Sequence, residues 1–115
     1  MGYLYYGTDP QPTEIPDRIL AHLRVVATTK LRRGESFTLT WRHPEGAPEG
    51  KTSLWIQPAI PLKFVFGSAE PEQLDPEWLH TLADAANTSN GLTLDWTDEA
   101  PHLKAVEPAR TAIAA

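Results

Sequence analysis

The residues of this sequence that can carry chemistry are few and dispersed. His80 and Asp84 lie four positions apart in a segment predicted to be helical, so one turn would bring the imidazole beside the carboxylate. Such a pair could share a proton or form part of a metal site. We interpret it instead as a solvent-exposed ion pair, because no third ligand lies close in the sequence. The other histidines, His22, His43 and His102, share no spacing with it.

The sequence also lacks the motifs of familiar enzyme classes. It contains no G-x-G-x-x-G, no G-K-[ST], no H-E-x-x-H and no G-x-S-x-G. Its 115 residues include no cysteine, which excludes disulfides, thiolate nucleophiles and cysteine-bound zinc. We therefore predict no catalytic residue, no metal and no cofactor. An enzyme whose site gathers side chains distant in sequence stays an open alternative.

Positive charge is concentrated in residues 16–43, which hold six basic and two acidic side chains in a chain of net charge -5. Four of the basic residues define a candidate contact for an anion or a nucleic acid: Arg24, Lys30, Arg32 and Arg33. The alternative, which we favour, is that they compensate the helix dipole on a solvated face. Lys30 falls within the apolar face of its helix. Its ammonium is either desolvated and reactive or, as we prefer, reaches water past the helix end.

These basic residues lie on the segment around which the chain is organised, a predicted helix that begins at Pro16 or Asp17 and ends before Gly34. Proline and aspartate favour a first turn, and glycine after a basic last turn is typical of a helix end. One face is apolar and needs a partner layer: Ile19, Leu20, Leu23, Val26, Ala27 and Leu31. The opposite face forms an outward stripe that we predict as an interaction surface: Arg18, His22, Val25, Thr29 and Arg32.

The other predicted elements are mostly strands. Alternating or aromatic runs predict strands at residues 3–6, 35–43, 52–57, 62–66 and 92–96. A second helix is predicted over 75–86, with Asp75 as its N-cap. The order β-α-β-β-β-α-β predicts an α+β fold, a mostly antiparallel sheet with two helices packed on one face. The three consecutive strands between the helices suggest an antiparallel meander.

The length suits one domain, which we place at residues 1–97, followed by a disordered C-terminal tail over 98–115. No apolar run is long enough to span a membrane, and the N-terminus shows no secretory signal. We therefore predict a cytoplasmic protein without a membrane partner.

Several segments, in this order, resemble a family of short actinobacterial proteins of unknown function: MGYLYYGT, IPDRILAHLRVVATTKLRRGESF, the W-x-H-P run from Trp41 to Pro44, LWIQPAIPLKFVF and PEWLHTLADAANTSNGL. The resemblance covers about residues 1–96. Some members of that family carry an automatic label of ATP-dependent DNA ligase. Such a ligase needs a lysine in a K-x-D-G motif, and none of the lysines fits: Lys30, Lys51, Lys63 and Lys104. The sequence therefore does not support self-contained ligase activity.

We interpret the chain as a small non-enzymatic binding module. Its partner would be another protein or a second copy in a homodimer, bound by the stripe on the first helix or by the sheet edge or face near Trp55. The alternative is a nucleic-acid-associated accessory protein, connected with DNA repair by the ligase label, that uses the basic first helix. The acidic balance of the whole chain counts against nucleic acid as the main partner.

Overall fold

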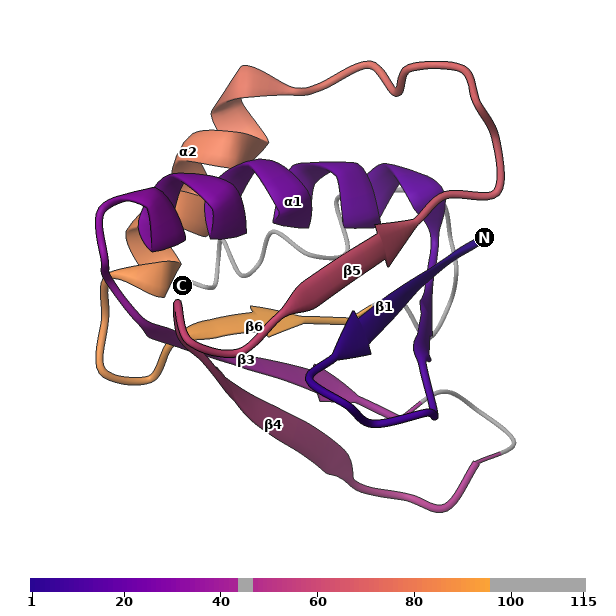
Figure 1. Ribbon diagram of the computed structural model, residues 1–115. Coiled ribbons are helices and arrows are strands. Elements are labelled where there is room, and N and C mark those ends of the chain that lie inside the picture. Colours follow the sequence, from indigo (N-terminus) through magenta and orange to yellow (C-terminus); the bar gives the residue numbers. More distant parts are fainter. Residues whose placement is uncertain (44–46, 96–115) are drawn as a thin grey trace.

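The computed structural model describes residues 1–43 and 47–95 (Figure 1). Their elements are β1 (Gly2–Tyr6), β2 (Thr13–Ile15), α1 (Asp17–Arg32), β3 (Phe37–Arg42), β4 (Lys51–Ile56), β5 (Leu62–Val65), α2 (Pro76–Ala86) and β6 (Leu92–Leu94). The order of helices and strands confirms the predicted α+β layout, and β2 is an added short strand. Predictions for Pro44, Trp96 and the tail 98–115 fall outside the described residues. Within the described ranges, no helix is long and apolar enough to cross a membrane.

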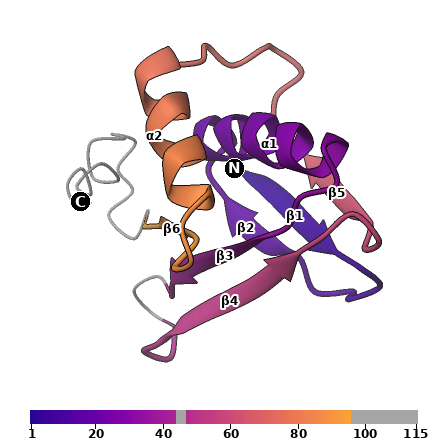
Figure 2. The ribbon, with the colours of Figure 1, turned by 90° about the vertical axis from the view of Figure 1, so that its left-hand side faces the viewer.

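The strands form two three-stranded sheets rather than one sheet (Figure 2). Sheet A has the order β2-β1-β5 and is antiparallel throughout. Sheet B has the order β4-β3-β6, in which β4 runs antiparallel to β3 and β6 runs parallel to it. The strand pairing is therefore mostly antiparallel, as predicted, but the strands belong to two separate sheets.

The predicted meander of three consecutive strands is wrong, because β5 leaves β4 and pairs with β1. The link between β4 and β5 contains Pro58 and Pro61, which lack the N–H group that a ladder needs. The link turns where the Ile60 amide donates to the Gln57 carbonyl at 3.2 Å, and the Pro61 carbonyl then accepts from the Gly7 amide at 2.9 Å. These bonds direct the chain out of one sheet and into the other.

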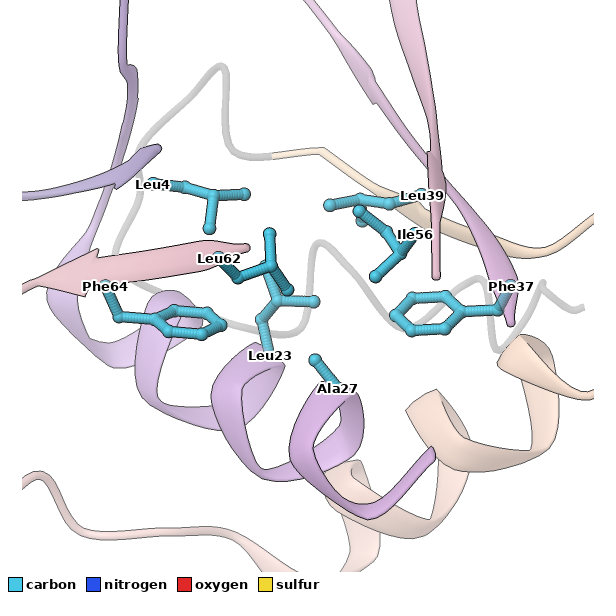
Figure 3. A pocket seen from close by; sticks show the side chains of 8 residues that line it. All are labelled: Leu4, Leu23, Ala27, Phe37, Leu39, Ile56, Leu62 and Phe64. Atoms are coloured by element: carbon cyan, nitrogen blue, oxygen red, sulfur yellow. The ribbon is translucent and has the colours of Figure 1, made fainter. Parts of the chain in front are cut away.

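The helix α1 lies across both sheets and supplies the centre of the core (Figure 1, Figure 2). Leu20, Leu23 and Val26 from its predicted apolar face are all buried. Leu23 points between the two sheets (Figure 3), where side chains of both sheets surround it: Leu4, Leu62 and Phe64 from sheet A, and Phe37, Leu39 and Ile56 from sheet B. The gap between them is lined by apolar side chains and has no room for a water molecule.

The helix α2 adds a second layer that packs on α1, β3 and β6. It begins at Asp75, whose side chain accepts hydrogen bonds from two amides of the first turn, so the predicted N-cap is confirmed. The connection from β5 to α2 runs over α1 (Figure 1). Asp17 anchors the start of this connection, because its carboxylate accepts hydrogen bonds from the Gly67 and Ser68 amides at 3.0 and 3.1 Å. The connection therefore begins beside the first turn of α1.

Candidate functional site

The outward stripe predicted on α1 is not exposed along its whole length, because one of its five residues, His22, is buried. Arg18, Thr29 and Arg32 are exposed and Val25 is half-buried, but His22 is completely buried. The outward placement of His22 is therefore wrong. The helical pattern predicted one partner layer for α1, whereas the structure packs α2 and its preceding connection on a second side of the helix.

His22 is held at the junction of the two helices. Its Nδ1 lies 2.7 Å from the Arg18 carbonyl oxygen, and its Nε2 lies 2.9 Å from the Asp75 amide nitrogen. Because a backbone N–H can only donate, Nε2 is the acceptor and the ring is neutral with its proton on Nδ1. Burial lowers the pKa of His22 below 6.5, and this effect outweighs the Arg18 carbonyl and the carboxylates of Asp75 and Glu72, which act to raise it.

Lys30 is buried rather than extended into water. Its Nζ lies 2.6 Å from the side-chain oxygen of Asn87, just after α2, and 3.2 Å from a carboxylate oxygen of Glu35. The expectation that the ammonium reaches water past the helix end is wrong, because the end of α2 covers that route. The lysine joins the C-terminal ends of the two helices, so it is removed from the candidate contact for nucleic acid.

The remaining basic residues of α1 face solvent. We refer to Arg18, Arg24 and Arg32, together with the C-cap residue Arg33, as the α1 arginines, and all four are exposed. The Arg24 guanidinium lies 5.1 Å from the centre of the Phe66 ring, which is a cation–π contact. Among the described residues, none of the four forms an ion pair. Their positive charge is therefore available to an anionic partner.

The pair of His80 and Asp84 is solvent-exposed, as predicted. His80 Nδ1 lies 3.3 Å from Asp84 Oδ2, with 80% and 70% of the two side chains exposed. Across the part of the chain that the structure describes, no group of three or more metal-ligating side chains is close enough to hold a metal ion. A surface pair in this setting contributes little beyond local helix stability.

The strand β4 carries the most exposed large hydrophobic side chain of the described residues. β4 lies at an edge of sheet B, and Lys51, Ser53 and Trp55 alternate along its outer face with Ile56 buried behind them. We call these three residues the β4 surface. Trp55 is 57% exposed. The alternation in the sequence already separated Trp55 from its apolar neighbours, and this is the signal that located the surface.

The backbone of β4 is directed outward at the same three positions. The Tyr6 hydroxyl from sheet A donates to the Trp55 carbonyl, so that carbonyl points away from β3. In an antiparallel ladder, alternate residues direct their N–H and C=O groups to the same side. Lys51 and Ser53 therefore also direct these groups to the edge, where no strand of the described chain pairs with them.

An enzyme would need a cavity that holds catalytic side chains, and the described part of the chain has two cavities to consider. The gap under Leu23 is apolar and has no room for water. A surface hollow of about 310 Å³ lies between the turn after β1 and the start of β5, and its lining includes Asp9 and Lys63 but no histidine. The Asp9 carboxylate already accepts a hydrogen bond from the Gln11 amide at 2.9 Å. Neither of these two cavities brings a histidine together with a carboxylate, which is the combination that would favour an enzyme.

A model of the domain of unknown function DUF7882 matches residues 1–98 of the chain. Searches of curated proteins and of solved structures find no match. The match supports the resemblance to a family of unknown function, whereas the actinobacterial origin and the ligase label are untested. Because it spans both helices and all the described strands, the chain belongs to the family of the domain of unknown function DUF7882.

Proposed function

We propose that the chain is a small binding module that captures an extended segment of another protein along β4. The observation that supports the proposal is the combination, on one edge strand, of an exposed tryptophan with outward-directed backbone groups. An edge strand of this kind accepts a further strand through backbone hydrogen bonds, while side chains on the sheet face provide specificity. The interaction needs no catalytic residue, metal or cofactor.

The β4 surface also limits the partner. The ladder with an added strand would form at Lys51 and Ser53 and would end at Trp55, because the Tyr6 hydroxyl already binds the Trp55 carbonyl. An apolar side chain of the partner would rest on the exposed indole, and a carboxylate would be favoured opposite the exposed Lys51. The proposed partner is therefore a short extended segment with an acidic and an apolar residue on one face.

Replacing Trp55 with alanine is expected to weaken the complex by about 2 kcal/mol, roughly thirtyfold, because a tryptophan that buries its indole against a partner is a typical hot spot. Stability should change by less than about 0.5 kcal/mol, because surface substitutions rarely matter to folding. Tyr3→Ala is the matched control, since Tyr3 is an exposed aromatic residue on sheet A. Affinity would be measured by titration calorimetry with the captured segment.

The segment can be captured through a unique thiol, because the chain has no cysteine. A photoreactive label on Ser53→Cys should crosslink to a discrete partner, and Trp55→Ala should abolish that crosslink. The same label on Ser89→Cys, an exposed position in the loop after α2, should not give it. Identical products from both positions would refute the proposal, and a crosslink between two copies of the chain would replace it with a homodimer.

A second candidate function is nucleic-acid binding through the α1 arginines, favoured by the absence of ion pairs at these residues within the described chain. Arg32→Glu should weaken binding to single- or double-stranded DNA at low salt and lower the slope of log K against log salt by about 0.7–0.9. Lys63→Glu, the same charge change on sheet A, should leave the slope unchanged. No gel-shift binding at low salt would eliminate this candidate.

A further inference from the structure

We propose that His22 is a proton-operated latch: while neutral it holds α2 and the connection before it on α1, and protonation releases them. The proposal is independent of the β4 surface. It rests on the position of a completely buried histidine between two helices, where its ring bridges a carbonyl of α1 and the N-cap residue of α2.

The bond to Asp75 is the one that protonation would break. The Asp75 amide donates to Nε2 of His22, and the Asp75 side chain in turn caps α2 by accepting from the Glu77 and Trp78 amides. A proton on Nε2 would remove the acceptor and place two donors against each other at 2.9 Å. Loss of this contact would therefore disturb Asp75, the residue that caps the N-terminus of α2.

The charges around the ring set the direction of the response. Arg18, on α1 itself, disfavours a second positive charge, whereas Asp75 and Glu72, from the connection before α2, favour it. Burial opposes the charged ring more strongly than the other influences. When the flap opens, His22 regains water and takes up a proton more readily, so acid drives the opening.

The packing of α2 is compatible with opening from this end. The Trp78 ring lies against His22 with 4.4 Å between ring centres, and Trp78 is buried with its indole N–H unpaired. Opening would give that N–H a water partner. At the other end, Lys30 holds Asn87 at 2.6 Å, and Asp17 holds the Ser68 amide at 3.1 Å. Residues 69–86 therefore form a flap that is anchored at both ends and latched by His22, and its opening would also expose Leu82 and Ala86, which are buried in the core.

Hydrogen exchange followed by mass spectrometry on the full chain tests the latch between pH 7.5 and 5.0, after correction for the intrinsic pH dependence of exchange. Below about pH 6.5, opening of residues 69–86 should increase by up to about tenfold per pH unit, because one proton is taken up. Exchange in β4, which lies at the far edge of sheet B from β6, should stay constant over the same range. A constant opening of the flap from pH 7.5 to 5.0 would overturn the proposal.

Three variants separate the latch from a general acid effect. His22→Gln keeps an oxygen that can accept from Asp75 but cannot titrate, so the pH response should disappear. His22→Phe removes the acceptor, so the flap should be open at both ends of the pH range. His80→Gln, at a solvent-exposed histidine on α2, should retain the full response. A pH response that persists in His22→Gln would overturn the latch.

Proton NMR of the unsubstituted chain provides a test that does not depend on the variants folding. Because burial lowers the pKa of His22 in the closed chain, its ring proton should titrate below the ordinary histidine range, at the acid end of the interval in which exchange of the flap increases. Titration of the ring without any change in exchange would show that His22 is buried for packing alone and would overturn the proposal.

Discussion

Replacing Gly91 with alanine should lower the free energy of unfolding by about 2–5 kcal/mol. Gly91 precedes β6 and has a φ of +77°, a conformation that L-residues with a Cβ avoid. A Cβ there would lie 2.4 Å from the Thr38 backbone oxygen, so β6 would have to move away from the centre of sheet B. Urea unfolding followed by circular dichroism measures the loss.

Gly34→Ala is the matched control for this substitution. Gly34 has a φ of +74°, and a Cβ built on it meets nothing within 4 Å. It should therefore show only the backbone strain of about 1–2 kcal/mol. The difference between the two variants measures the contact with Thr38. Equal losses for both variants would mean that β6 shifts at negligible cost.

Replacing Leu23 with alanine should cost about 3–5 kcal/mol, at the upper end for a buried leucine. Leu23 is 2% exposed and points between sheet A and sheet B (Figure 3), so its truncation removes contacts to both sheets at once. The space left would join the gap that already lies there, and the cost of such a substitution rises with the volume of the cavity. The measurement is the free energy of unfolding in urea.

Thr28→Ala on the same helix is the control, because Thr28 is exposed and should change stability by less than about 0.5 kcal/mol. A loss below about 1.5 kcal/mol for Leu23→Ala would show that the sheets can close onto α1 and refill the space. Leu23 would then not be the side chain that holds the two sheets together.

Much of the secondary structure could be predicted because it depends on neighbours in the sequence. The start and end of α1, the Asp75 cap of α2 and the alternation around Phe37 and Leu39 are all local signals, and the structure agrees with each. The partner of β5 could not be predicted in this way. Phe64 pairs with Leu4, which lies about sixty residues earlier in the chain. The period-2 pattern of a strand shows which side chains share a face, but it does not specify which other strand lies alongside.

Among the candidate site residues, the exposure of Trp55 could be predicted from local sequence, whereas the burial of His22 and Lys30 could not. Trp55 was identified because alternation alone assigns it to the face opposite Leu54. His22 and Lys30 were misplaced because a helical wheel divides residues into one apolar face and one polar face. When a second helix covers the boundary, polar side chains become buried, and they then need partners such as Asp75 and Asn87 that no local pattern predicts.

The two sheets alternate along the chain, and this has a consequence for how the protein is made. Sheet A joins residues 2–15 to 62–65, and sheet B joins 37–56 to 92–94. On a ribosome, β1 cannot pair with β5 until residue 65 has been made, and β3 cannot pair with β6 until residue 94 has been made, so sheet A can be completed before sheet B. The apolar face of α1 is therefore made well before either of the sheets that cover it is complete, and the two sheets close over it one after the other.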